Sequence, residues 1–204
     1  MDFLKILPMA FVMIAGPQIL SAIFLATSEG WRRNSAAYVF GAALSISAFV
    51  TIAFLIGGGI KPDDGSSDTL YVIVLVLLVA AAIHVYLKRE ESEPPKWMGK
   101  LQDATPRFSF TLGFLLLGIF PTDILTSFAV GSYLANKSDS ILQALPFVGL
   151  TLLFLATPAL LVIALRERGQ VLLPKIRDWM NTNSWVVNEI VIGLFILLTL
   201  NNLL

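Results

Sequence analysis

Residues Gly118 to Phe128, "GIFPTDILTSF", place a proline and a carboxylate in the middle of an apolar run that extends from about 108 to 135. A proline inside a helix removes a backbone hydrogen bond and bends the chain. A carboxylate at the centre of a bilayer costs about 2.5–3.5 kcal/mol on insertion scales. Because such groups are tolerated in lipid only where they meet protein, water or a ligand, the stretch predicts a bent membrane helix with a candidate site at the bend.

The composition of the whole chain also indicates a membrane protein. Of 204 residues, 56% are hydrophobic and 14% are charged, and the mean hydropathy is +0.80. Soluble domains carry about 25% charged residues, so this chain cannot cover itself with polar surface. The net charge of zero argues against a nucleic-acid partner. The lack of cysteine excludes disulfides, thiol redox chemistry and thiolate metal sites.

Six stretches are long and apolar enough to cross a bilayer, which takes about 20 residues. They are 3–28, 35–60, 69–88, 107–135, 141–166 and 185–204. The first of them resembles a signal peptide in length, but it has no basic residues before its apolar part and holds Pro17 and Gln18 at its centre. We therefore expect a retained span and an all-α polytopic membrane protein with six transmembrane helices.

The basic residues predict the orientation of these spans. Eleven of the 14 Lys and Arg fall on one side, and only Lys5, Lys61 and Lys137 fall on the other. The basic side of a membrane protein is normally cytoplasmic. We therefore expect a multi-pass protein of the cell (inner) membrane with both termini outside. The eleven are Arg32, Arg33, Lys88, Arg89, Lys96, Lys100, Arg107, Arg166, Arg168, Lys175 and Arg177.

The sequence contains a weak internal repeat. "PQILSAIFLATS" (17–28) aligns with "TDILTSFAVGSY" (122–133) at an offset of 105, and "VFGAAL" (39–44) aligns with "FVGLTL" (147–152) at an offset of 108. Each repeat holds three spans, so the second copy enters the membrane from the opposite face, as in many secondary transporters. We expect a single transmembrane domain, 1–204, in which repeat one (about 1–90) and repeat two (about 107–204) are joined by a cytoplasmic connector (about 89–106).

Prolines and polar residues gather near the middle of the first, fourth and fifth spans, where they predict a substrate-binding or coupling site between the repeats. A structural alternative is that the prolines are packing kinks and that Asp123 pairs with a hydroxyl or an amide. The candidate residues are Pro17, Gln18, Ser21, Pro121, Thr122, Asp123, Thr126, Thr157 and Pro158.

Two further ionisable residues, His84 and Glu189, each lie about one turn inside the cytoplasmic ends of the third and sixth spans. They form a candidate hydrogen-bonded pair, which is either part of a proton path or a structural latch.

Between the last two spans, "ERGQVLLPKIRDWMNTNS" (167–184) repeats Leu172, Ile176 and Trp179 at helical spacing. This pattern fits either a short helix in the lipid headgroup layer or a surface loop. Hard cations require several oxygen ligands, and only Asp123 is central. No nucleophile–base pair occurs, so we expect no metal site, no cofactor and no enzymatic activity.

Two motifs carry a resemblance to a known family. A mid-span proline followed by polar residues in "AGPQIL" (15–20) and "FPTDIL" (120–125) resembles the LysE-type exporter superfamily. "AGP" (15–17) and the connector "EPPKWMGKLQDATPRFSFTLGFLL" (93–116) resemble its GAP branch, the glycopeptidolipid- and sulfolipid-addressing proteins. The resemblance implies six spans in two inverted triplets and export of lipids or lipid-linked amphiphiles from the cytoplasmic leaflet.

The sequence leaves two other functions open. One is a LysE-type exporter of small solutes such as amino acids or cations. The other is a membrane scaffold that docks a lipid-synthesis enzyme and transports nothing. The expected partners are membrane lipids, a lipid or amphiphile substrate and, through small residues in the second span, a further copy of the chain.

Overall fold

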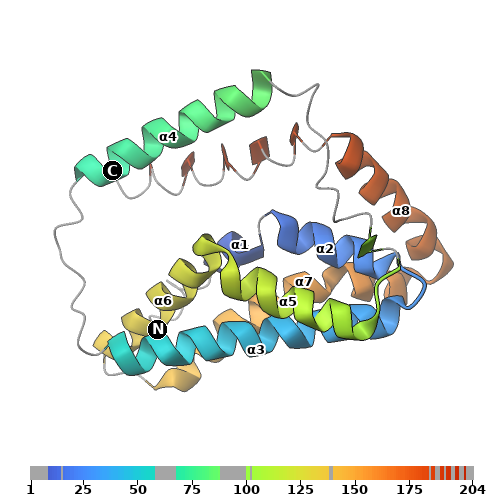
Figure 1. Cartoon of the computed structure of the whole chain (residues 1–204), viewed down its shortest axis with the longest axis horizontal. Helices are drawn as coiled ribbons and strands as arrows, with labels where there is room; N and C mark the ends of the chain where they lie inside the picture. The colour runs from blue at the N-terminus through green and yellow to red at the C-terminus, as the bar shows by residue number, and fades with distance from the viewer. Residues whose placement is uncertain are drawn as a thin grey trace. The chain divides into compact units, whose positions relative to one another are not determined.

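The computed structural model describes residues 9–57 (without 15), 68–87, 100–137 (without 102) and 140–200 (without 184, 187, 188, 191, 194, 195, 198 and 199). Every regular element in these residues is a helix, which confirms the all-α prediction (Figure 1). The helices are α1 (Met9–Ile14), α2 (Pro17–Ala26), α3 (Trp31–Gly57), α4 (Asp68–Leu87), α5 (Pro106–Ile119), α6 (Pro121–Asn136), the 3-10 helix η4 (Ile141–Ala144), α7 (Leu145–Leu165) and α8 (Glu167–Thr182).

The chain folds into two compact units. The first comprises Met1–Lys61 with Lys96–Lys175, and the second comprises Pro62–Pro95 with Ile176–Leu204. Within the second unit, Tyr86 at the end of α4 meets Trp185 edge-on, with 6.1 Å between the ring centroids. The first unit contains the candidate site residues of the first, fourth and fifth predicted spans.

The long helix α3 is the centre of the first unit and packs against α2, α5, α6 and α7. Two glycines allow α3 and α5 to touch backbone to backbone. A Cβ atom on Gly41 would fall on the backbone carbonyl of Phe110, and one on Gly113 would fall on the carbonyl of Tyr38. Small residues at such crossings are the usual means of packing membrane helices closely. Gly41, a small residue of the second predicted span, therefore packs against another helix of the same chain, and contact with a further copy stays a prediction.

The contacts along α3 fix the direction of its neighbours. Gly41 meets α5 at Phe110, and Gly131 of α6 meets α3 near Val50, so α5 and α6 follow α3 in the same direction. The helix α2 runs the opposite way, as two contacts show. Near the start of α2, the Gln18 carbonyl accepts a hydrogen bond from the Tyr38 hydroxyl. Asn34, earlier in α3, donates to Ser28, which lies beyond the end of α2.

Among the described residues, two helices are long and apolar enough to cross a membrane, Trp31–Ile56 and Ile141–Leu165. A third candidate is the pair α5 and α6, which is bent by 68° at its break. The first predicted span (3–28) contains two short helices, α1 and α2, in place of one long one. The structure thus contains two to three candidate spans, and the six-span prediction is not confirmed by it.

The helical alternative for the segment that follows α7 is confirmed, since α8 extends over Glu167–Thr182. Leu173 is buried, whereas Leu172 and Trp179 are 44% and 52% exposed. Contact of this helix with lipid headgroups stays a prediction.

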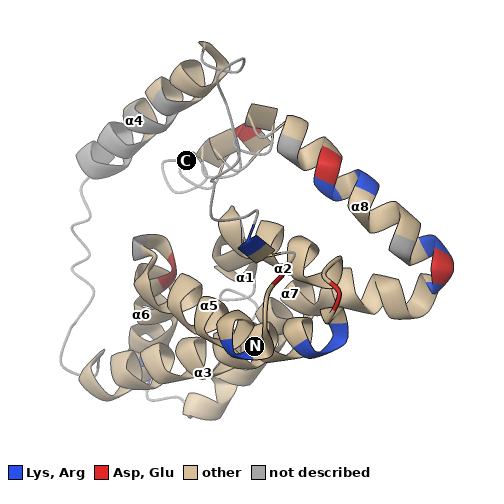
Figure 2. Cartoon of the chain, turned by 45° about the vertical axis from the view of Figure 1, so that its right-hand side comes forward, with Lys and Arg blue, Asp and Glu red and all other residues tan. Residues whose placement is uncertain are grey.

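The five arginines of the first unit lie at the beginnings of α3 and α5 and around the turn between α7 and α8 (Figure 2). These are Arg32, Arg33, Arg107, Arg166 and Arg168. The far ends of α3 and α6 carry Lys137 as their described basic residue. The arrangement agrees with the charge asymmetry of the sequence.

The close approach of α3 and α5 gives a stability prediction. Replacing Gly113 by Ala forces the two backbones apart, and overpacking of this kind costs about 1–3 kcal/mol. At about 2–4 °C per kcal/mol for a chain of this size, Tm in detergent should fall by about 2–12 °C. The matched control is Gly149→Ala on α7, where a Cβ atom meets nothing within 4 Å. Its Tm should stay the same or rise, and equal Tm values for both variants and the parent would contradict the packing.

Candidate functional site

The first helix break lies at Gly16, between α1 and α2. Gly16 has φ 103° and ψ −137°, a backbone conformation that glycine adopts readily and other residues rarely do. Pro17 then begins α2, where its fixed φ and its missing N–H suit the first turn of a helix. The sequence Gly16-Pro17 therefore ends one helix and starts the next in the middle of an apolar stretch.

The second break lies at Phe120, between α5 and α6. Phe120 is extended, with φ −64° and ψ 126°, because a following proline disfavours the helical conformation. Pro121 begins α6, and Asp123 lies in its first turn. The positive end of the helix dipole favours a negative charge at this position. Both breaks thus have the same design, in which a proline is the first residue of the second helix.

A buried hydrogen bond joins the two breaks. The amide Nε2 of Gln18 donates to Oδ2 of Asp123 over 2.6 Å. Gln18 is 1% exposed and Asp123 is 0% exposed. The two residues are 105 positions apart, which is the offset at which 17–28 aligns with 122–133. The equivalent residues of the two candidate repeats are therefore in contact with each other.

Tyr38 of α3 holds this contact from a third helix, and the sequence analysis did not identify it. Its hydroxyl donates to the Gln18 carbonyl over 2.8 Å, and its side chain is 0% exposed. A buried tyrosine normally finds a partner for its hydroxyl. A lone tyrosine in the apolar second span was therefore the signal available in the sequence.

Several oxygens near the breaks have no hydrogen-bond partner in the part of the chain that the structure describes. They are Gln18 Oε1, Asp123 Oδ1, Ser127 Oγ and Ser45 Oγ. Ser127 lies one turn after Asp123 on α6, and Ser45 lies against Gly118 near the end of α5. Unpaired polar groups are costly in a low-dielectric interior. The oxygens are suited to accept hydrogen bonds from water or from the hydroxyl, amide or ammonium groups of a bound molecule.

Other predicted site residues use their hydroxyls within their own helices. Ser21 donates to Pro17 O over 2.6 Å, Thr126 to Thr122 O over 2.7 Å, and Thr157 to Leu153 O over 2.9 Å. Such bonds to the carbonyl four residues back are common for Ser and Thr in helices. Pro158 is buried inside α7, which continues through it from Leu145 to Leu165. The structure brings Gln18 and Asp123 together, with the Thr122 side chain interacting with the Asp123 carboxyl, whereas the hydroxyls of Thr126 and Thr157 bond within their own helices.

His84 and Glu189 belong to the second unit. His84 is exposed in the last turn of α4. Oε1 of Glu189 is buried and has no hydrogen-bond partner among the residues that the structure covers. Their pairing stays a prediction.

The hydrogen bond between Gln18 and Asp123 can be tested by a double-mutant cycle of Gln18→Leu and Asp123→Leu. Each single change leaves one polar group buried without its partner, whereas the double change removes both. The loss of unfolding free energy in the double variant should therefore be smaller than the sum of the two single losses. The difference should be about 0.6–1.7 kcal/mol, as for other hydrogen bonds between membrane helices.

The matched control cycle pairs Gln18→Leu with Thr126→Leu, because the Thr126 hydroxyl is bonded within α6. That cycle should give no coupling. Additive effects of Gln18→Leu and Asp123→Leu in thermal unfolding would show that the two side chains do not interact.

Comparison with known proteins connects this geometry to a family. A family model described as "Sap, sulfolipid-1-addressing protein" matches residues 6–203 and so covers both helix breaks. No curated protein and no solved structure matches the chain. The family match confirms the resemblance to the GAP branch that "AGP" and the connector indicated. The chain belongs to the sulfolipid-1-addressing protein family.

Proposed function

We propose that the protein is an exporter that moves lipids or lipid-linked amphiphiles out of the cytoplasmic leaflet. In this proposal the chain crosses the inner membrane six times, as two inverted three-span repeats with both termini outside. The substrate passes the two helix breaks, where Gln18 and Asp123 form the polar centre of the path.

The contact between Gln18 and Asp123 is the observation that carries the proposal. When two copies of a motif are related by a two-fold axis, a residue meets its own equivalent only at the axis. A hydrogen bond between residues at the repeat offset of 105 is therefore what an inverted pair of repeats predicts. The helix directions support this reading, because α2 runs against α3 whereas α5 and α6 run with it.

Helix breaks at such a position suit transport. Transporters built from inverted repeats place their substrate sites at discontinuous helices near the bilayer midplane. Here both breaks lie in apolar stretches, and their buried oxygens lack partners among the described residues. Rocking of one repeat against the other about the contact of Gln18 with Asp123 exposes these oxygens to one side of the membrane at a time.

The family description names the addressing of a sulfolipid, which favours a lipid over a small solute as the substrate. The buried carboxylate of Asp123, which accepts a hydrogen bond from the Gln18 amide, is the feature that suits a cationic small solute. A scaffold for a lipid-synthesis enzyme does not need partnerless oxygens at two helix breaks. The three functions therefore differ in what they require of Asp123.

The test is lipidomics of a deletion strain, comparing surface-exposed with retained lipids. In the deletion strain, at least one amphiphile that the parent strain exposes on its surface should be retained inside the cell. The wild-type chain should restore display, and Asp123→Asn should not. This change keeps the acceptor oxygen for Gln18 and the size of the side chain, but it removes the negative charge.

The control is Thr111→Val, which changes an exposed side chain of α5 whose hydroxyl bonds to the Arg107 carbonyl within its own helix, and it should restore display. Each variant must be present in the membrane at the parent level. An unchanged lipid distribution in the deletion strain would contradict lipid export. Full restoration by Asp123→Asn would contradict a role for the Asp123 charge.

A further inference from the structure

A groove of about 600 Å³ lies on the first unit, between the first half of α3 and the second half of α7. Its apolar walls are formed by Val39 and Ala43 of α3 and by Leu152, Ala156 and Leu160 of α7. The groove exists because α3 and α7 carry small alanine side chains along it, between larger residues of the same two helices. It lies apart from the polar contact at the helix breaks, since none of its lining residues is Gln18 or Asp123.

One end of the groove is polar. Ser35 lines it and is 6% exposed, yet its hydroxyl has no hydrogen-bond partner among the described residues. Arg32 lies one turn earlier on α3, and its guanidinium carbon is 5.2 Å from the centre of the Trp31 ring. Both Trp31 and Arg32 also line the groove. Arg32 is exposed and forms no ion pair with a described acidic residue.

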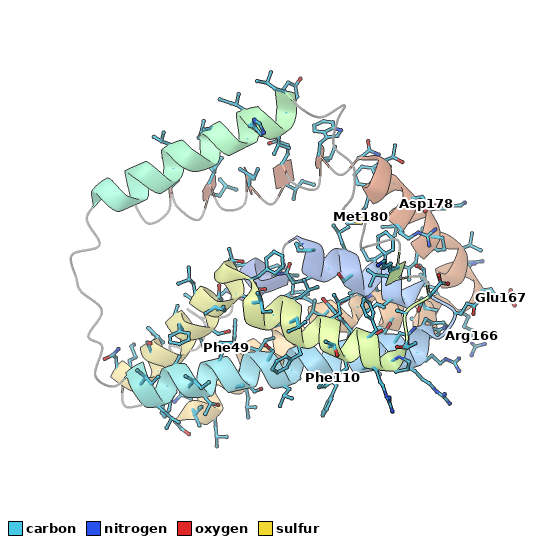
Figure 3. The ribbon with its side chains drawn as sticks, in the orientation of Figure 1. Phe49, Phe110, Arg166, Glu167, Asp178 and Met180 are labelled. Carbon is cyan, nitrogen blue, oxygen red and sulfur yellow. The ribbon has the colours of Figure 1, made fainter. Side chains whose placement is uncertain are left out.

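This end lies at the level where the basic residues of the first unit gather. The last turn of α7 contributes Ile163 to the groove, and Arg166 and Glu167 follow in the turn to α8 (Figure 3). By the charge asymmetry of the sequence this is the cytoplasmic side. A Trp–Arg pair at such a level is typical of the interface between headgroups and hydrocarbon.

We propose that the groove binds one acyl chain of an anionic lipid from the cytoplasmic leaflet. The chain lies along the alanine-lined walls, and the anionic headgroup accepts hydrogen bonds from the Arg32 guanidinium and the Ser35 hydroxyl. The volume of about 600 Å³ falls within the roughly 300–1,000 Å³ of ordinary ligand sites. The charge of Arg32 selects an anion, and the single polar end selects an amphiphile.

This inference rests on the proposed function in one respect, since it makes the groove the place where the exporter receives its substrate. The binding itself is a separate property. It requires only α3 and α7, and it can be measured without transport.

Trp31 reports on the groove in a variant in which Trp97, Trp179 and Trp185 are replaced by Phe. The probe is quenching by phosphatidylglycerol or phosphatidylcholine that is brominated on one acyl chain, in nanodiscs of otherwise unbrominated phosphatidylcholine. The anionic lipid should quench Trp31 at a mole fraction about fivefold lower than the zwitterionic lipid. This ratio corresponds to about 1 kcal/mol for one basic residue at a membrane surface.

Two pairs of variants on this background separate the groove from the general surface. Arg32→Gln should abolish the preference for the anionic lipid, whereas Arg33→Gln, a neighbour outside the groove, should keep it. Ala156→Phe fills the groove and should lower quenching by both lipids. Ala164→Phe adds the same bulk to α7 at an exposed position outside the groove and should leave quenching unchanged.

Equal quenching by the two lipids would mean that ordinary boundary lipid fills the groove and would overturn the proposal. A preference that survives Arg32→Gln would overturn it as well. Protection of Trp31 from both lipids, together with cross-linked dimers, would assign the groove to a second copy of the chain. A preserved preference in a protein whose deletion leaves surface lipids unchanged would support the groove and contradict export, so the two failures are distinguishable.

Discussion

A carboxylate in an apolar interior needs a partner, and the hydrogen bond from Gln18 to Asp123 meets that need while it ties two parts of the chain together. The bond connects α2 with α6 across 105 residues and fixes both helix breaks at the same depth in the first unit. Since both groups are fully removed from solvent, losing either one leaves a buried polar group without a partner. The hydrogen bond therefore stabilises the placement of α2 beside α6, and hence the candidate path.

The long helix α3 supports the contact from behind. Its close packing holds α5 at Gly41 and Gly113 and α6 at Gly131, and the Tyr38 hydroxyl binds the backbone of Gln18 directly. The same helix presents its other side to α7 and forms the apolar groove there. One rigid helix therefore positions the polar centre and the groove independently, so a lipid in the groove need not displace the hydrogen bond.

The sequence predicts much of the polar centre because proline and carboxylate are rare and costly in apolar spans. Pro17, Gln18, Pro121 and Asp123 were identified for that reason, and the alignment at an offset of 105 makes Gln18 and Asp123 equivalent positions. Thr157 and Pro158 also combine a proline with a polar residue in an apolar span, yet α7 continues through them. The Thr157 hydroxyl bonds within the helix, and packing decides whether a proline interrupts it. The groove has no signal in the sequence, since it arises only when alanines of two distant segments face each other.

Cross-linking of cysteines at positions 18 and 123 tests the central contact most directly, because the chain has no cysteine of its own. A protease site is added to the connector between the repeats, and a short bifunctional thiol reagent is applied in native membranes. The two fragments should stay together until reduction. The control pair is Gln18→Cys with Leu125→Cys, since Leu125 is 69% exposed on another face of α6, and its fragments should separate. Separation of the fragments of the 18/123 pair, or equal linkage of both pairs, would contradict a site built on the contact between Gln18 and Asp123.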